Sequence, residues 1–281
     1  MDLGVVIVNW NSGDCLGRLL ASLEPLLPEL RSVIVVDNNS GDRSQEPAAG
    51  LDPVILHRFS SNRGFAAAAN FGIEQAKSRF ILLLNPDVEI RPPAIRQLYR
   101  RAEAMPRLAI ACGRLVNLDG SGQEAFQLRP LPRFWSVFSD ALFFDEISRI
   151  LFRRARTSPP QSLQAQLGIP VEQPAAAFWL LRTEAWATLG GFDESFFPAW
   201  FEDVDFCKRL RATDWEIRFF PDLECVHRGG ISLSVMDYSD FIRCYYANEL
   251  RYLKKHHPAW YPFLWLPVQL GSWIRILIGG K

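Results

Sequence analysis

The 281-residue sequence predicts an α/β fold in which helices flank a single mixed sheet. The first observation is that short apolar runs alternate with segments whose apolar residues recur at helical spacing. The second is that two of these runs, Val33–Val36 and Ile81–Leu84, are followed closely by an aspartate. The third is a turn signal at Asn117–Gly120, which interrupts the alternation and predicts a hairpin within the otherwise β/α pattern.

The composition of the chain is that of a globular protein with a substantial core. With 48% hydrophobic and 22% charged residues, the chain can bury a substantial core. Its 31 basic and 31 acidic residues cancel, so no overall charge attracts it to nucleic acid. The five cysteines include no Cys-x-x-Cys pair, which favours free thiols in a reducing cytosol. The N-terminus has no basic segment before its apolar run, so residues 5–8 are expected to form a strand and not a signal peptide.

The first half of the chain predicts a series of strands and helices in alternation. Strands are expected at residues 3–9, 32–37 and 53–57, and helices at residues 16–23 and from residue 65. In the helix from residue 65, Phe65 is followed by four alanines, which favour helix and allow it to lie close to the sheet or to a ligand. Simple helix–sheet packing explains the alanines equally well, and it does not exclude a ligand at the helix N-terminus.

The central strand is expected at Ile81–Leu84, where four large aliphatic residues indicate burial on both faces of a sheet. Pro86 ends the strand, so that Asn85 and Asp87 lie on a short turn at its carboxyl end, the edge where open α/β sheets bind ligands. Two oxygen ligands there suit a hard divalent cation. In the alternative interpretation, Asp87 only caps the next helix.

The second half predicts further strands and helices around a less regular segment. A helix is expected from residue 92, strands at residues 108–113, 175–181 and 215–220, a short helix from residue 183 and a long amphipathic helix from residue 237 to residue 257. The turn at Asn117–Gly120 predicts a hairpin between the strand near Val116 and a segment that ends at Leu128. Residues 130–174 lack clear periodicity and are expected to form a variable helical insertion with a basic loop, which acts as a lid or is merely solvated.

Aromatic and acidic residues alternate between Phe192 and Cys207, within one loop and the start of one helix. So many aromatic side chains predict a desolvated cleft, in which closely spaced carboxylates repel and one can act as a base. Alternatively, Glu202 and Asp205 interact only with the helix dipole. His227 lies at a strand end before two glycines and is interpreted as a metal or phosphate ligand, or else as a structural histidine.

The C-terminal residues 259–278 combine many aromatic and aliphatic side chains with interruptions at Pro262, Pro267 and Arg275. The segment therefore lacks the roughly twenty clean apolar residues of a spanning helix. With Lys254 and Lys255 beside it, the segment predicts an interfacial helix on an anionic membrane. The alternative is a packing or dimerisation tail.

An ordered set of short motifs then resembles the inverting glycosyltransferases of family 2, and within them the bacterial rhamnosyltransferase-like branch. The motifs are Asn9-Trp10-Asn11, Asp37-Asn38-Asn39-Ser40-Gly41-Asp42, Asn62-Arg63-Gly64-Phe65, Asn85-Pro86-Asp87, Gly190-Gly191-Phe192-Asp193-Glu194, Glu202-Asp203-Val204-Asp205 and His227 with Gly229-Gly230. The resemblance implies a GT-A fold with a Rossmann-like sheet, a nucleotide-sugar donor and a divalent metal, Mg²⁺ or Mn²⁺. It implies one GT-A domain at residues 1–257, with a nucleotide-sugar-binding half at 1–113 and an acceptor-binding half at 114–257, followed by an interfacial segment at 258–281.

The resemblance also implies roles for individual residues. Asp203 corresponds to the catalytic base, with Glu202 beside it, and Asp87 and His227 correspond to the metal ligands. Phe201 stands where the family often has tyrosine. The implied donor-binding residues are Asn9, Asp37, Asn39, Asn62, Gly64, Asn70 and Asn85, and the implied acceptor-binding residues are Trp200, Phe201 and Asp205.

The expected function is metal-dependent, inverting transfer of rhamnose from dTDP-rhamnose to a cell-surface glycan or lipid-linked acceptor. The expected location is cytoplasmic, peripheral to the inner face of the cell membrane, and a homodimer is among the expected assemblies. One alternative is an inverting transferase that uses a UDP- or GDP-linked sugar. Another is a catalytically silent module that binds nucleotide sugars or glycans. A nucleotidyltransferase would need a basic Gly-rich loop after the first strand, which residues 9–13 lack.

Overall fold

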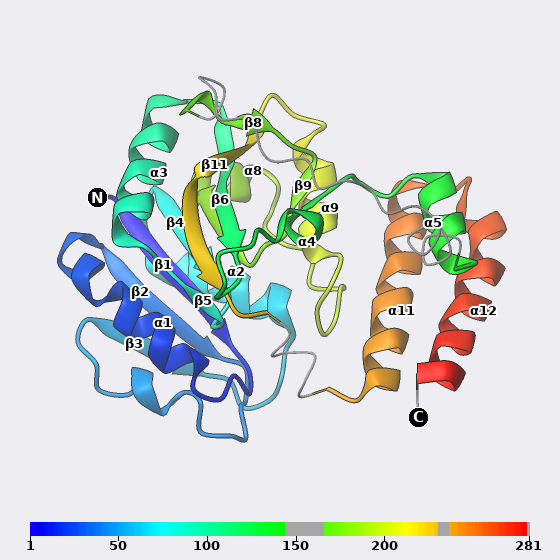
Figure 1. The fold of residues 1–281 in the computed structure, drawn as a ribbon, viewed down its shortest axis with the longest axis horizontal. Helices are drawn as coiled ribbons and strands as arrows, with labels where there is room; N and C mark the ends of the chain where they lie inside the picture. The colour runs from blue at the N-terminus through cyan, green and yellow to red at the C-terminus, as the bar shows by residue number, and fades with distance from the viewer. Residues whose placement is uncertain (144–165, 230–235, 280–281) are drawn as a thin grey trace.

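The computed structural model describes residues 1–143, 166–229 and 236–279. A twisted central sheet is covered by helices, and a separate group of three helices lies beside it (Figure 1). The apolar half of the expected insertion at 130–174 includes α5 (Phe134–Ala141), whereas its basic loop lies outside the described residues.

In the part of the chain that the structure describes, the central sheet has nine strands, and eight of them follow one another in a single hydrogen-bonded order. In spatial order these are β3 (Val54–Arg58), β2 (Ser32–Asp37), β1 (Leu3–Asn9), β4 (Phe80–Leu84), β10 (Phe178–Arg182), β6 (Leu108–Val116), β11 (Glu216–His227) and β5 (Val88–Glu89), with β8 (Ile169–Pro170) paired to β11. The first four are parallel to one another. Because β10 runs antiparallel to both β4 and β6, the sheet is mixed, as the sequence predicts.

Both faces of the sheet are covered by helices. Alternate residues of β1 enter two different cores: Val6 packs beneath one face and Val5 beneath the other. Such alternation of fully buried positions is the reason that these strands appear in the sequence as continuous apolar runs. The covering helices are α1 (Cys15–Leu23), α2 (Phe65–Ala76), α3 (Pro92–Ala104), α8 (Thr183–Thr188) and α9 (Glu202–Leu210).

The expected hairpin at Asn117–Gly120 forms only next to its turn, where Val116 and Gly122 make an isolated antiparallel bridge, and the returning strand expected to run to Leu128 is wrong. The tight turn forms, with the Asn117 amide donating to the Ser121 carbonyl at 2.8 Å, but the chain then enters α4 (Glu124–Gln127) instead of returning as a strand. The side chain of Gln127 takes the place of that strand, because its amide donates to the Gly113 carbonyl and its oxygen accepts from the Leu115 amide. The following β7 (Leu128–Arg129) pairs with β9 (Gln173–Pro174) in a separate two-stranded sheet.

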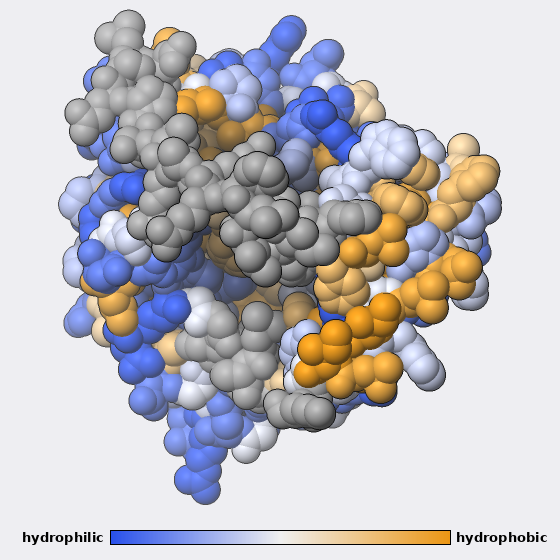
Figure 2. All heavy atoms as spheres, turned by 45° about the vertical axis from the view of Figure 1, so that its right-hand side comes forward, coloured by the Kyte–Doolittle hydropathy of each residue, from blue (hydrophilic) through white to orange (hydrophobic). Residues whose placement is uncertain are grey.

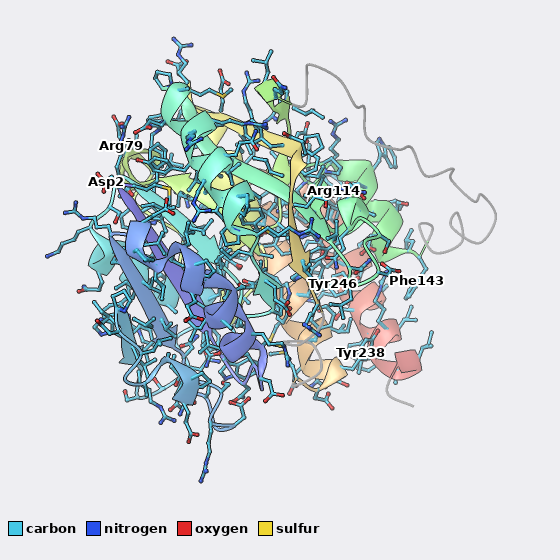
Figure 3. All side chains as sticks on the ribbon, turned by 60° about the vertical axis from the view of Figure 1, so that its left-hand side comes forward. Asp2, Arg79, Arg114, Phe143, Tyr238 and Tyr246 are labelled. Carbon is cyan, nitrogen blue, oxygen red and sulfur yellow. The ribbon has the colours of Figure 1, made fainter. Side chains whose placement is uncertain are left out.

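The long helix expected from residue 237 forms, and the C-terminal extension that follows it is also helical, as expected. α11 (Tyr238–His256) and α12 (Tyr261–Gly279) pack against each other and against α5. The Tyr246 hydroxyl donates to Asp140 at 2.9 Å, and the Arg275 guanidinium lies 4.1 Å from the Phe143 ring at the same junction (Figure 3). Within the described part of the chain, no helix combines the length and apolarity needed to cross a membrane.

Candidate active site

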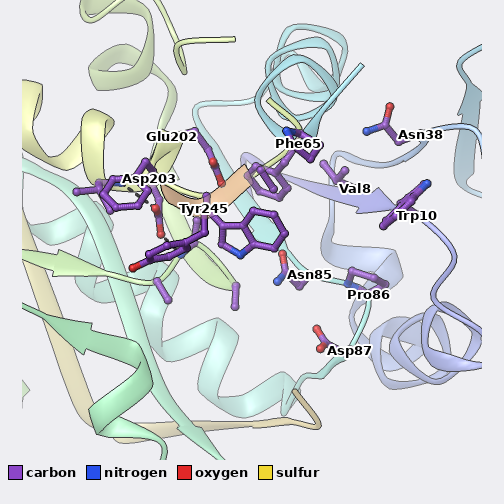
Figure 4. A pocket seen from close by; sticks show the side chains of 18 of the residues that line it. Val8, Trp10, Asn38, Phe65, Asn85, Pro86, Asp87, Glu202, Asp203 and Tyr245 are labelled. Atoms are coloured by element: carbon purple, nitrogen blue, oxygen red, sulfur yellow. Dashed lines mark hydrogen bonds between the residues drawn. The ribbon is translucent and has the colours of Figure 1, made fainter. Parts of the chain in front are cut away.

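The carboxyl ends of the parallel strands meet at one edge of the sheet, where a cavity of about 250 Å³ opens (Figure 4). Asn9 ends β1, Asp37 ends β2, and Asn85 follows β4. The cavity brings together most of the functional residues that the sequence predicts. Those that line it are Asn62, Asn85, Asp87, Trp200, Phe201, Glu202, Asp203 and His227.

One side of the cavity is formed by Asp87 and His227, which lie far apart in the sequence. The short β5 pairs with the end of β11, placing Val88 opposite His227. The Asp87 Oδ2 atom therefore lies 3.5 Å from the His227 Nε2 atom. The other carboxylate oxygen, Oδ1, is buried and has no hydrogen-bond partner among the described residues.

The His227 ring is held in a defined orientation. Its Nδ1 atom lies 2.6 Å from the Gln123 side-chain oxygen, and the Gln123 amide donates to the His227 carbonyl at 2.7 Å. The Phe126 ring stacks on the imidazole at a centroid distance of 5.4 Å. We assign the ring proton to Nδ1, which leaves the Nε2 lone pair directed toward Asp87.

These two residues fit a divalent cation. A neutral imidazole nitrogen and an unsatisfied carboxylate oxygen are both metal-ligand groups, and the buried Oδ1 atom needs a partner. Among the described residues, no group of three or more His, Cys, Asp or Glu side chains could hold a metal. A cation here would therefore complete its coordination with water and substrate oxygens, which is the usual arrangement for Mg²⁺ at phosphates.

A second side of the cavity begins at the N-terminus of α9. Trp200 and Phe201 both have positive φ, 72° and 73°, an uncommon and costly backbone conformation for bulky residues. Edge-on contacts hold them in place: Trp200 packs on Phe241 at 4.9 Å and Phe201 on Tyr245 at 5.2 Å between ring centroids. The turn directs the next two residues, Glu202 and Asp203, to the cavity.

The two carboxyl groups differ in their hydrogen bonds. Asp203 accepts from the Gln173 side chain at 2.9 Å and from the Ala176 amide at 3.3 Å, whereas the Glu202 Oε2 atom has no partner among the described residues. Burial raises the pKa of both carboxyls, and the neighbouring Asp203 charge raises that of Glu202 further. The Arg129 cation and three amide donors oppose the rise at Asp203. Because the pKa of Glu202 is raised more strongly than that of Asp203, Glu202 holds its proton to a higher pH than Asp203 does.

The predicted donor residues occupy three kinds of position. Asn62 and Asn85 line the cavity directly. Asn9 and Asp37 lie beneath it, where the Asn9 amide donates to Asp37 Oδ1 at 2.8 Å and both side chains are fully buried. Asn39 is exposed, and its neighbour Asn38 lines the cavity instead.

Gly64 begins the wall formed by α2. Its φ of +86° and its closeness to the Pro198 carbonyl, which a Cβ atom would meet at 3.0 Å, require a glycine. The next amide, that of Phe65, donates to the same Pro198 carbonyl at 2.7 Å. The N-terminus of α2 therefore holds the loop that precedes α9.

Two further predicted site residues, Asn70 and Asp205, also lie outside the cavity lining. The Asn70 side chain bonds both the amide and the carbonyl of Phe192 at 2.9 Å, bracing the loop before α9. Asp205 is fully buried and lies 2.7 Å from both Arg209 and His256, so it joins α9 to the end of α11. Their geometry therefore supports the site without facing a ligand.

Four residues at the site were not identified from the sequence as functional. Gln123 orients His227, Gln173 bonds Asp203, and Arg129 and Tyr245 line the cavity. Single glutamines and arginines in segments without periodicity carry no signal of their own. Only Tyr245 stood in a recognisable pattern, the amphipathic helix expected from residue 237.

Comparisons with known proteins agree with this geometry. Residues 4–162 match the family model described as Glycosyl transferase family 2. Over 94% of its length, the chain is 28% identical to an N-acetylglucosaminyl-diphospho-decaprenol L-rhamnosyltransferase of Mycobacterium tuberculosis, of which it covers 88%. It is 22% identical to the low-salt glycan biosynthesis hexosyltransferase Agl10 of Haloferax volcanii, covering 86% of that protein with 100% of its own chain.

Solved structures share the fold. The mannosyltransferase PcManGT of Pyrobaculum calidifontis, in complex with GDP-Man and Mn²⁺, aligns with a TM-score of 0.58 at 14% identity, over 96% of this chain and 69% of that one. GalNAc-T7 with UDP, GalNAc and Mn²⁺ aligns with a TM-score of 0.60 at 15% identity, over 80% of this chain and 43% of that one. These alignments confirm the GT-A fold.

The burial of Glu202 predicts a pH-dependent effect of its removal. Folding raises the pKa of Glu202, so the folded protein binds this proton more tightly than the unfolded chain does. The free energy of unfolding therefore falls as the pH rises above the carboxyl's ordinary pKa, about 4.3, where the unfolded chain can release the proton. Glu202→Gln stays neutral, so we expect it to melt at a higher temperature than the wild type at pH 7 and at nearly the same temperature at pH 4. Calorimetry across this range measures the difference.

The matched control is Glu74→Gln, which changes an exposed carboxyl on α2. Its melting temperature should follow that of the wild type at every pH. A Glu202→Gln protein that melts below the wild type at pH 7, or by a constant difference at all pH values, would contradict the assignment of a buried, protonated Glu202.

Proposed function

The chain belongs to glycosyl transferase family 2, and on that premise we propose that it catalyses inverting, metal-dependent transfer of rhamnose from dTDP-rhamnose to a lipid-linked or cell-surface glycan acceptor. The family and the named relatives make it an enzyme that transfers a sugar. The observation that carries the proposal is the arrangement of one cavity, which is lined by the Asp87–His227 pair and by the buried Asp203. Figure 4 shows Asp87 and Asp203 on different sides of this cavity. This arrangement suits a reaction in which the negative charge on a leaving group must be neutralised and a nucleophile must lose a proton to a base.

The donor's diphosphate is proposed to lie against Asp87 and His227. When bound there, Mg²⁺ or Mn²⁺ supplies Lewis-acid neutralisation of the charge that develops on the leaving diphosphate. The protein's own part is to present the Asp87 carboxylate and His227 Nε2 together, with Gln123 holding the imidazole in the metal-binding tautomer. Asn62 and Asn85, which line the cavity, offer amides to the rest of the donor.

The acceptor hydroxyl is proposed to approach Asp203. An ionised Asp203 accepts the hydroxyl proton as the oxygen attacks the sugar's anomeric carbon, while the bond to the diphosphate breaks on the opposite face. A single displacement of this kind inverts the anomeric centre. Glu202 lies beside Asp203 and is proposed to stay protonated. It then adds no second negative charge near the base and can donate a hydrogen bond to the acceptor.

The choice of donor and acceptor rests on the relatives. The Mycobacterium protein, which aligns over nearly the whole chain, is named for transferring L-rhamnose and for a decaprenol-linked acceptor. The division into a donor half at residues 1–113 and an acceptor half at 114–257 remains part of the proposal. It agrees with Asp87 lying in the first half and Asp203 in the second, although His227 contributes to the donor side from the second half.

We also propose that α12 attaches the protein to a membrane surface. Its outer face carries an apolar stripe in which Phe263 is 71% and Trp273 is 69% exposed, and Figure 2 shows hydrophobic side chains gathered on this side of the molecule. An exposed stripe that runs the length of a helix is typical of an interfacial segment. Lys255 is paired with Asp193 and Asp205, at 2.6 Å each, so of the two adjacent lysines Lys254 has the more accessible charge.

The mechanism distinguishes the two aspartates experimentally. Asp203→Asn cannot accept a proton, so we expect donor and metal binding near wild type and a transfer rate lower by about two to four orders of magnitude. Asp87→Ala removes a proposed metal ligand, so metal-dependent donor binding should weaken together with turnover. Calorimetric donor affinity with and without Mn²⁺, the melting temperature and the transfer rate, measured across a panel of nucleotide sugars, provide the comparison.

Asp214→Asn serves as the control, because this exposed aspartate lies beyond the end of α9 and away from the cavity. It should bind and transfer as the wild type does. A folded Asp203→Asn protein that retains more than about a tenth of the wild-type rate would exclude Asp203 as the base.

Membrane attachment is tested by point variants, because deleting α12 would also remove its fully buried Leu264 and Val268 and so uncover the faces of α5 and α11 on which α12 packs. Changing Trp273 and Leu277 together to glutamate places two charges on the exposed stripe. We expect the fraction that sediments with anionic vesicles to fall at least tenfold, since charges are costly at an apolar interface. Ile55→Glu, on the β3 edge, is the control and should sediment as the wild type does; equal sedimentation of all three proteins would refute the attachment.

A further inference from the structure

Arg129 is a cation in the cavity for which the mechanism above gives no role. It lies on β7, which pairs with β9, the strand that also carries Gln173. Its Nε atom is buried without a hydrogen-bond partner among the described residues, and it forms no ion pair with any of them. An unpartnered buried group of this kind is uncommon in folded proteins and calls for an explanation.

Arg129 is near both the Asp87–His227 side and the Glu202–Asp203 side of the cavity. Its guanidinium is 5.8 Å from the centre of the Phe126 ring, and that ring stacks on His227. Its charge also reaches Glu202 and Asp203, because it lowers the pKa of both carboxyls against the effect of burial. The cation is therefore near the proposed diphosphate side and near the proposed base.

Arg129 is not simply the ion-pair partner of these carboxyls. Glu202 Oε2 is likewise buried without a hydrogen-bond partner among the described residues, so the two neighbouring groups remain unpaired. Asp203 is satisfied instead by Gln173 and backbone amides. A guanidinium near a carboxylate that it does not bind is free to bind an anion that enters the cavity.

From these contacts we propose that Arg129 binds a phosphate group of a substrate. The guanidinium is a planar fork of N–H donors that matches phosphate oxygens, and charge-assisted hydrogen bonds of this type are among the strongest in proteins. The inference rests on the proposed function, in which two substrates carry diphosphates, the nucleotide-sugar donor and the lipid-linked acceptor. Both sources present the same chemistry, and the experiment separates them.

The test compares Arg129→Gln and Arg129→Lys with the wild type. The control is Arg133→Gln, which removes an equal charge from an exposed arginine four positions along the chain that does not line the cavity. The measurements are the donor dissociation constant by calorimetry, and the KM and kcat for two acceptors, one linked through a diphosphate and one a neutral glycoside of the same sugar.

A phosphate-binding Arg129 predicts a loss confined to phosphate-bearing substrates. If the acceptor supplies the phosphate, Arg129→Gln should raise the KM for the diphosphate acceptor about tenfold to a hundredfold and leave the neutral acceptor and the donor affinity unchanged. If the donor supplies it, the donor dissociation constant should rise by that factor and both acceptors should be affected equally. Arg129→Lys should recover part of the loss, because it keeps the charge without the fork.

Two results would overturn the proposal. In the first, kcat falls equally with both acceptors, donor affinity is unchanged, and the acid limb of the pH–rate profile moves to higher pH; Arg129 would then serve only to keep Asp203 ionised. In the second, Arg129→Gln behaves as Arg133→Gln does in every measurement. If the wild type transfers no sugar, the proposed function fails separately, and the affinity for inorganic diphosphate, measured with the same variants, still decides whether Arg129 binds phosphate.

Discussion

The antiparallel pairing of β5 with the end of β11 is the contact on which the whole site depends. It joins the turn after the central strand to the last strand of the sheet, and so places Asp87 beside His227. The backbone supports the same junction, because the Arg228 amide donates to the Asp87 carbonyl at 3.0 Å. Without this pairing, the two halves of the chain would present Asp87 and His227 separately.

Burial is the second constraint, and it acts differently on each acidic group. Glu202 and Asp203 lie at the start of α9, reached through two bulky residues in the left-handed conformation. Their environments then diverge, since Asp203 accepts several hydrogen bonds and Glu202 Oε2 accepts none from the described residues. Two adjacent carboxyls in unequal environments are a common means of obtaining one base and one proton donor in the same site.

The sequence predicted the features that follow from local pattern. Apolar runs ending in Asp37 or before Asp87 located the strands and the functional sheet edge, because parallel strands bury both faces and open at their carboxyl ends. It could not predict that Gln127 would replace a returning strand, or that Gln123 would orient His227. Such contacts depend on the path of irregular segments, which side-chain amides can stabilise without leaving any periodicity in the sequence. The role of Asp205 could not be predicted for a similar reason: its place in the motif is the same whether its carboxylate contacts a ligand or forms ion pairs within the protein.

The central claim is that a divalent cation belongs to the Asp87–His227 side of the cavity and that the Glu202–Asp203 side is reserved for the acceptor. A crystal grown with Mn²⁺ and a nucleoside diphosphate, measured at a wavelength where manganese scatters anomalously, tests this directly. The account predicts one anomalous peak within about 2.0–2.4 Å of Asp87 Oδ1 and His227 Nε2. A peak coordinated by Glu202 and Asp203, with none beside Asp87 and His227, would contradict it.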